Sequence, residues 1–248
     1  MDRAALKARA REVIATSNPK VLTVGLVYLL IGIVLNALGA RVMSVNISES
    51  ELMNYMRYAA EGNYEYALEY LKTMEPPTAA YAINSLLKVI SGIIGAGFVI
   101  FLLNTIRNRQ PCFANLLDGF GIWWKVILLN FLQSLIIGLW SLLLVVPGVI
   151  AYYRYSQALY ILIDDPTKSP VQCLRESKSM MAGHKKELFQ LDLSLIGWFL
   201  LAMIPYVGYA VQVWSVPYIG MIKALYYEKL LGRNVWSYTP DYPPDYPL

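Results

Sequence analysis

The chain has 248 residues, of which 57% are apolar and 15% are charged, and its mean hydropathy is +0.44. Soluble domains usually contain about 45–50% apolar and about 25% charged residues. The apolar excess is gathered in long uninterrupted runs, which indicates segments that cross a bilayer. The composition therefore predicts a polytopic membrane protein and excludes a disordered chain, a disulfide-rich miniprotein and a coiled coil. The two cysteines, Cys112 and Cys173, belong to no metal-binding motif, so we expect no metal site and no cofactor.

The positions of the charged residues predict how the chain is oriented. Basic residues gather in segments 1–20, 104–125 and 164–187, whereas segment 41–80 carries six glutamates. Lys and Arg concentrate in loops that stay in the cytoplasm. The basic segments should therefore lie inside the cell and the acidic segment outside it. In that case both cysteines are cytoplasmic and should be reduced thiols.

The N-terminal segment 1–19 is predicted to form a cytoplasmic amphipathic helix that ends at Asn18-Pro19, because a residue before proline avoids the helical region. Its apolar stripe consists of Leu6, Ala10, Val13 and Ile14. Such a helix fits the surface of a membrane, and a solvated helical leader is the alternative. The uncharged run 21–40 that follows is long enough to cross the ~30 Å bilayer core. A cleavable signal peptide is the competing interpretation of that run.

Residues 41–78 are predicted to form an acidic helical loop on the outer side. Ser48 and Glu51 have the spacing of a capping box, which begins a helix. Gly62-Asn63 interrupts that helix, a second helix with a Tyr/Leu/Met face follows, and Pro76-Pro77 ends it. We expect this helical pair to lie on the outer bilayer surface or to pack on the bundle.

The remaining apolar sequence completes an all-α bundle of six transmembrane helices over residues 20–233, with both termini in the cytoplasm. The runs 126–163 and 188–227 are each too long for one crossing, and they break at Pro147-Gly148 and at Pro205 to Gly208. The spans are expected at about 21–40, 79–103, 126–146, 149–163, 188–204 and 208–227. In the second span, Gly92 to Gly97 make a small-residue face for close helix packing.

The last two hairpins resemble each other. Trp140-x-Leu-Leu-x-x-x-Pro147 recurs 58 residues later as Trp198-x-Leu-Leu-x-x-x-Pro205, and each hairpin ends in Ala-Leu-Tyr. We interpret this as a parallel duplication of a cytoplasmic helix plus a transmembrane hairpin, an arrangement found among transporters. A chance match in Leu- and Trp-rich sequence is the alternative. The tail 234–248 repeats Pro-Asp-Tyr-Pro and is expected to be an extended cytoplasmic chain that either serves as a partner ligand or has no role.

Several blocks of the sequence are similar to those of a known family. They are Arg3-x-x-Leu6-Lys7-x-x-Ala10 and residues 139–166, 176–205 and 217–230. On these blocks, and over nearly its whole length, the chain resembles the bacterial integral membrane proteins catalogued as domain of unknown function 975. The resemblance implies a multi-pass protein of the bacterial cell membrane. It supplies no catalytic residue.

Ionisable residues inside the predicted spans are the first candidates for a binding site, because a charge at mid-bilayer costs roughly 2.5–3.5 kcal/mol on insertion scales. They are Lys88, Arg154, Asp192 and Lys223. Lys88 is closest to mid-span and should face the bundle interior, whereas the others can reach toward an interface. With the polar neighbours Asn36, Asn130, Gln133 and Ser134 they would form a cleft for an anionic substrate or a lipid headgroup. Hydrogen bonding between helices is the alternative role.

A basic segment next to the predicted spans supplies a second set of candidates, for contact with anionic lipid headgroups at the cytoplasmic face. They are Arg175, Lys178, Lys185 and Lys186. The alternative is that these residues only set the orientation of the chain. The single histidine, His184, stands among basic residues, and no common catalytic motif occurs, so we assign no catalytic residue.

Three function classes follow from these patterns. We favour a non-enzymatic membrane protein that binds lipids or partner proteins, a second copy of the chain among them, because the sequence signals concern placement in a bilayer. The second class is a transporter or exporter of small molecules or lipids with a polar intramembrane path. The third and least supported class is a lipid-modifying enzyme. We expect no nucleic-acid partner.

Overall fold

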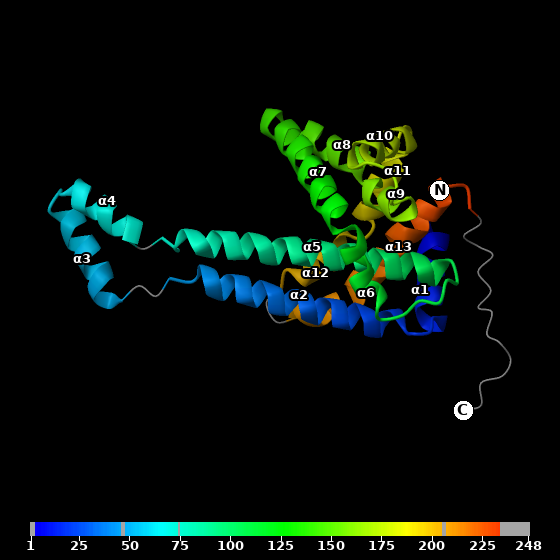
Figure 1. Cartoon of the computed structure of the whole chain (residues 1–248), viewed down its shortest axis with the longest axis horizontal. Coiled ribbons are helices and arrows are strands. Elements are labelled where there is room, and N and C mark those ends of the chain that lie inside the picture. The colour runs from blue at the N-terminus through cyan, green and yellow to red at the C-terminus, as the bar shows by residue number, and fades with distance from the viewer. Residues whose placement is uncertain (1–2, 46–47, 74, 205–206, 234–248) are drawn as a thin grey trace, which may run out of the picture. The chain divides into compact units, whose positions relative to one another are not determined.

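The computed structural model describes residues 3–45, 48–73, 75–204 and 207–233 (Figure 1). These residues form helices and no strands, which confirms the all-α prediction. The tail 234–248 and Pro205, which belongs to the proposed repeat, lie outside the described residues. The chain divides into two compact units, Met1–Leu30 with Gly92–Leu248, and Ile31–Ser91.

The smaller unit, Ile31–Ser91, contains the predicted acidic loop. Helix α3 (Glu49–Ala60) begins at the capping box, where the Ser48 backbone N–H donates to the Glu51 carboxylate at 2.8 Å and the Glu51 N–H donates to the Ser48 hydroxyl at 3.2 Å. Gly62 has a positive φ of 73°, which glycine adopts without steric cost, and it separates α3 from α4 (Tyr64–Thr73). The two helices pack against each other as a hairpin (Figure 1). The capping box and the helical pair are confirmed.

Three helical stretches of the described chain are long and apolar enough to cross a bilayer. The first two are α2 (Val21–Met43) and α5 (Thr78–Ile106), and the third is Asn115–Leu143. That third stretch consists of α6 (Asn115–Asp118), the 3-10 turn η1 (Gly119–Ile122) and α7 (Trp123–Leu143). The later apolar sequence forms α8 (Val145–Tyr155), α9 (Ala158–Asp164), α11 (Lys185–Leu193), α12 (Ile196–Ala202) and α13 (Val207–Leu230), and α10 (Pro170–Met180) lies between α9 and α11.

The turn between α7 and α8 lies earlier than Pro147-Gly148, where the sequence analysis expected it. The helix breaks at Leu144, whose φ of −162° and ψ of 148° are extended. Pro147 falls in the first turn of α8, where a missing backbone N–H removes no helical hydrogen bond. Gly148 lets α8 pack closely on α7, because a Cβ there would lie 2.1 Å from the Ser141 hydroxyl oxygen.

Helix α13 is the centre of the larger unit. Tyr226 and Tyr227 on α13 are fully buried, and most of the helix from Pro217 to Glu228 is buried as well. Helix α1 (Arg3–Thr16) packs against α13. The predicted apolar stripe of α1 is buried, comprising Leu6, Ala10, Val13 and Ile14. This stripe therefore contacts the protein, which corrects both the membrane-surface and the solvated-leader interpretations.

Basic residues of α1 are also engaged within the protein. The Arg3 guanidinium donates to the Gln190 carbonyl at 3.4 Å, and the Lys7 ammonium donates to the Ser194 carbonyl at 3.0 Å. These carbonyls belong to the C-terminal end of α11, where the helix dipole favours cations, and the Gln190 carbonyl also accepts from the Ser194 N–H at 3.2 Å. Helix α1 therefore caps α11.

The small-residue face of α5 makes its closest contact with α6 and η1. A Cβ on Gly97 would lie 2.1 Å from the Leu116 carbonyl oxygen, and a Cβ on Gly119 would lie 2.2 Å from the Ile93 carbonyl oxygen. A Cβ on Gly92 would have an ordinary contact at 3.5 Å. The predicted close packing on this face is thus found at Gly97, where only glycine lets the two backbones approach.

Candidate functional site

A polar cavity of about 240 Å³ lies inside the larger unit. Its polar lining comes from α7, the α8–α9 junction, α11 and α13, and comprises Asn130, Gln133, Tyr152, Ser156, Gln157, Tyr160, Asp192 and Lys223. Two of the predicted binding residues, Asp192 and Lys223, therefore share one cavity. Asn130 and Gln133, which the sequence analysis named as polar neighbours, line it too.

Asp192 and Lys223 form the charged centre of this cavity. The Lys223 Nζ lies 3.5 Å from the Asp192 Oδ1, and the two side chains are 29% and 17% exposed. The Tyr153 hydroxyl donates to the Asp192 Oδ2 at 3.2 Å. The Asp192 Oδ1 has no hydrogen-bond partner among the described residues. At 3.5 Å the ammonium of Lys223 therefore balances the charge of Asp192 without giving Oδ1 a hydrogen bond.

A break between α8 and α9 positions Gln157 in the cavity wall. The Ser177 hydroxyl of α10 accepts from the Gln157 N–H at 3.2 Å and donates to the Arg154 carbonyl at 3.0 Å, which satisfies backbone groups at the break. The Gln157 side-chain amide donates to the Ser156 hydroxyl at 3.0 Å. Its Oε1 has no partner within the described chain, although Gln157 is only 3% exposed. Gln157 was not predicted from the sequence, where the only indication of its role is that a polar residue interrupts the apolar run 149–163.

The other two predicted binding residues lie elsewhere. Arg154 is half-buried on α8 and does not line the cavity. Lys88 belongs to the smaller unit, is exposed, and lines a separate hollow of about 240 Å³ with Asn36 and Asn84. Arg154 is therefore not part of this cavity, and Lys88 is exposed within the smaller unit, where its depth in the predicted span favoured an enclosed side chain.

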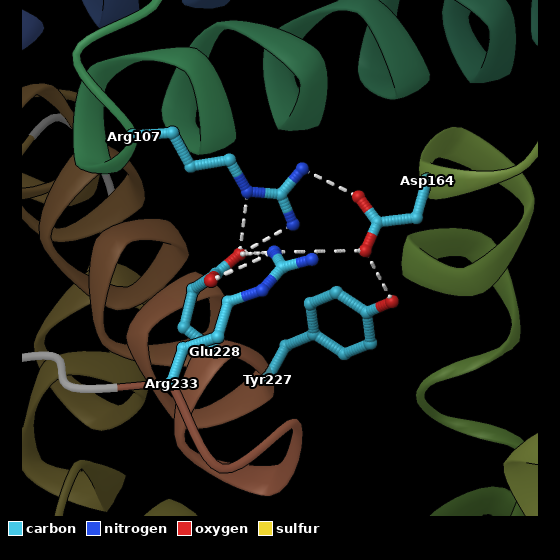
Figure 2. A network of polar contacts seen from close by, with 5 residues as sticks. All are labelled: Arg107, Asp164, Tyr227, Glu228 and Arg233. Atoms are coloured by element: carbon cyan, nitrogen blue, oxygen red, sulfur yellow. Dashed lines mark hydrogen bonds and ion pairs between the residues drawn. The ribbon is translucent and has the colours of Figure 1, made fainter.

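A second polar cluster, the Arg107 network, joins the ends of three helices (Figure 2). It consists of Arg107 after α5, Asp164 at the end of α9, Tyr227 and Glu228 near the end of α13, and Arg233 beyond it. The Arg107 guanidinium donates to Asp164 at 2.5 Å and, through Nε, to Glu228 at 2.7 Å. The Tyr227 hydroxyl donates to Asp164 at 2.9 Å, and Arg233 donates to Glu228 at 3.1 Å.

The Arg107 network is largely removed from solvent. The Glu228 side chain is 3% exposed and that of Arg107 is 11% exposed. Burial acts to lower the pKa of Arg107, but its hydrogen bonds with Asp164 and Glu228 outweigh burial and hold that pKa above its ordinary value. Two cations balance two carboxylates, so the network is a structural clamp. From the sequence, Arg107 was interpreted only as a signal for the orientation of the chain. The signal that could have indicated the network is the pair of acidic residues, Asp164 and Glu228, at the inner ends of two predicted spans.

The predicted lipid-binding residues occupy an exposed basic face of α10 and α11. Helix α10 buries Cys173, Leu174 and Ser177 against its neighbours. Arg175, Lys178 and Lys186 are exposed and Lys185 is half-buried. None of these four side chains has an ion-pair or hydrogen-bond partner in the described part of the chain. By contrast, Lys125 donates to the Thr167 carbonyl at 3.3 Å, and Lys168 pairs with Glu176 at 2.8 Å.

Both cysteines are free thiols in this structure. Cys112 is exposed and Cys173 is buried, and burial raises the pKa of the Cys173 thiol. Within the described residues, no group of three or more His, Cys, Asp or Glu side chains could hold a metal ion.

The exposed apolar surface and the long apolar helices indicate the class of protein. Apolar side chains around the α7–α8 turn are exposed, with Leu142 at 86% and Val145 at 75%. Soluble monomers rarely expose a large contiguous apolar patch, and three helices of the described chain can cross a bilayer. These are the features of a helical membrane protein.

Residues 142–234 match the family described as "Protein of unknown function (DUF975)". The match supports the resemblance to this family over residues 142–234, and it does not include the block Arg3-x-x-Leu6-Lys7-x-x-Ala10. It includes Arg154, Asp192, Lys223 and the basic face of α10 and α11, whereas Lys88 lies outside it. No curated protein and no solved structure matches the chain.

Proposed function

We propose that the chain is a non-enzymatic, multi-pass protein of the bacterial cell membrane that binds anionic lipid headgroups through the basic face of α10 and α11. The observation that carries this proposal is the exposure of Arg175, Lys178 and Lys186 without a protein partner in the described chain. By contrast, Arg3 and Lys7 of the same unit cap α11, and Arg107 and Lys168 form ion pairs. A basic residue close to an anionic membrane surface contributes about 1 kcal/mol to binding.

A six-span topology supports this placement. After α2, α5 and α7, the pairs α8–α9 and α11–α12 and the single helix α13 provide three further crossings. At 1.5 Å per residue, residues 145–164 extend about 30 Å and the 24 residues of α13 extend about 36 Å, close to the bilayer core thickness. In this topology both termini, α1, α10 and the Arg107 network lie in the cytoplasm, and α3 and α4 lie outside.

The proposed duplication of the two hairpins has structural support. A glycine shortly after each turn packs closely on the preceding helix. A Cβ on Gly148 would lie 2.1 Å from the Ser141 hydroxyl oxygen, and a Cβ on Gly208 would lie 2.2 Å from the Ala202 carbonyl oxygen. Helix α7 packs on α8, and α12 packs on α13. We infer that the two hairpins arose from one repeated unit.

A triple variant, Arg175→Gln with Lys178→Gln and Lys186→Gln, tests the lipid proposal. In nanodiscs, phosphatidylglycerol should raise the melting temperature of the unmodified protein over that in phosphatidylcholine. The variant should lose this difference, and its apparent affinity for phosphatidylglycerol should fall about 100-fold, because three contacts of about 1 kcal/mol each are removed. Native mass spectrometry of retained lipid measures the affinity.

The matched control removes three basic residues from the acidic loop, as Arg41→Gln with Arg57→Gln and Lys72→Gln. The control should respond to phosphatidylglycerol as the unmodified protein does. Equal lipid dependence in both triple variants would contradict the proposal.

A second candidate function is transport of a small solute or a lipid along a polar path. The observation that favours it is the cavity around Asp192 and Lys223, which is lined by residues of several helices of the larger unit. This function requires that the cavity bind a ligand, and a cavity that binds none excludes it.

A further inference from the structure

The cavity around Asp192 and Lys223 has two hydrogen-bond acceptors that the described protein leaves without donors. They are the Oε1 of Gln157, on a residue that is 3% exposed, and the Oδ1 of Asp192. Buried polar atoms are nearly always hydrogen-bonded, and leaving one unpaired costs about 1–3 kcal/mol. Both residues line the same space, and their two unpaired oxygens are buried beside it. That space therefore suits a ligand that donates hydrogen bonds.

The charges of the cavity restrict the ligand further. Lys223 and Asp192 contribute one charge of each sign, so a ligand with a net charge would add an unbalanced charge to a half-buried site. Their 3.5 Å separation is longer than the about 2.7–2.9 Å of a tight charged hydrogen bond, so the pair leaves both groups able to bind a ligand. A zwitterion supplies an oxyanion for Lys223 and a cation for Asp192.

The remaining walls favour an ammonium as the cation. Tyr152 and Tyr160 line the cavity, and the faces of aromatic rings attract cations. A primary ammonium has three N–H donors, enough for both unpaired acceptors. The volume of about 240 Å³ is below the about 300–1,000 Å³ of pockets for drug-sized ligands, so the ligand is the size of a headgroup.

We propose that this cavity binds a small zwitterion that carries a primary ammonium and an oxyanion. Asp192 and Gln157 accept hydrogen bonds from the ammonium, and Lys223 binds the oxyanion. The same chemistry occurs in the ethanolamine phosphate headgroup of a membrane lipid and in free zwitterions of similar size. This site is separate from the basic face of α10 and α11 and takes a ligand of different charge.

The test compares ethanolamine with choline compounds, because the three methyl groups of choline remove every N–H donor. The full chain in detergent is melted with glycerophosphoethanolamine or glycerophosphocholine, which are phosphodiesters without net charge, and in nanodiscs of phosphatidylethanolamine or phosphatidylcholine at constant phosphatidylglycerol. We expect saturating ethanolamine compound to raise the melting temperature by about 5 °C or more over the choline compound. A response to free glycerophosphoethanolamine identifies a soluble zwitterion, and a response in nanodiscs alone identifies a lipid headgroup.

Two variants connect the response to the cavity. Asp192→Asn should abolish the ethanolamine response. Gln157→Met, which keeps the side-chain length, should raise the ligand concentration for half of the full response at least tenfold. If Asp192→Asn does not fold, the response of Gln157→Met to ethanolamine tests the proposal by itself. The triple variant of the basic face should keep the ethanolamine response while it loses the phosphatidylglycerol response. Equal responses to ethanolamine and choline, no response in either setting, or a full response in a folded cavity variant would overturn the proposal.

Discussion

Replacing Arg107 with methionine is expected to lower the free energy of unfolding by about 3 kcal/mol. The change leaves the Glu228 carboxylate, whose side chain is 3% exposed, close to Asp164 with only Arg233 to balance both. Removing one partner of a buried ion pair typically costs about 3–5 kcal/mol. Because Arg233 still pairs with Glu228, we expect the lower end of that range.

Thermal unfolding in detergent measures this effect. For a chain of this length, about 3 kcal/mol corresponds to a decrease in melting temperature of roughly 6–12 °C. Arg109→Met is the matched control, since Arg109 is exposed and lies in the same segment. Equal melting temperatures for the two variants would show that the Arg107 network does not clamp the helix ends.

Replacing Gly97 with alanine is expected to destabilise the larger unit by about 3 kcal/mol. The new Cβ would lie 2.1 Å from the Leu116 carbonyl oxygen and 2.8 Å from the Asn115 carbonyl oxygen. These neighbours are backbone atoms of α6, so relief requires α5 and α6 to move apart. Overpacking of this kind typically costs about 1–3 kcal/mol, and a backbone neighbour places the change at the upper end.

Gly138→Ala in α7 provides the control for Gly97, because nothing lies within 4 Å of its Cβ position. Alanine is favoured over glycine in a helix by about 0.5–1 kcal/mol, so Gly138→Ala should unfold at the same or a slightly higher temperature. The same melting temperature for Gly97→Ala and Gly138→Ala would contradict the close approach of α5 to α6.

Local patterns in the sequence predicted much of this fold. The capping box at Ser48 and Glu51 and the apolar stripe of α1 depend on residues within one or two helical turns of each other. Periodicity identifies such features because their partners lie on the same helix. What the stripe contacts was not predictable, because α13 lies about 200 residues further along the chain.

Partners far apart in sequence explain most of what the sequence analysis missed. Arg107 binds residues that lie 57 and 121 positions away, so no local spacing marks the network. Lys88 was placed inside the bundle on its depth in a span, but depth does not decide which face of the helix a residue occupies. Asp192 and Lys223 were each identified as charged residues in spans, whereas only the structure shows that they meet.

The proposed lipid-binding function requires that the basic face of α10 and α11 lie on the cytoplasmic side of the membrane. Cysteine accessibility measures this orientation most directly. Ala60→Cys at the end of α3 and Ser179→Cys on α10 are introduced singly into a Cys112→Ser background, and intact cells are treated with a membrane-impermeant maleimide. Both positions are exposed on the protein. We predict that residue 60 reacts in intact cells and that residue 179 reacts only after the membrane is permeabilised. Labelling of residue 179 in intact cells, with residue 60 protected, would place the basic face outside the cell and contradict the proposed lipid-binding function.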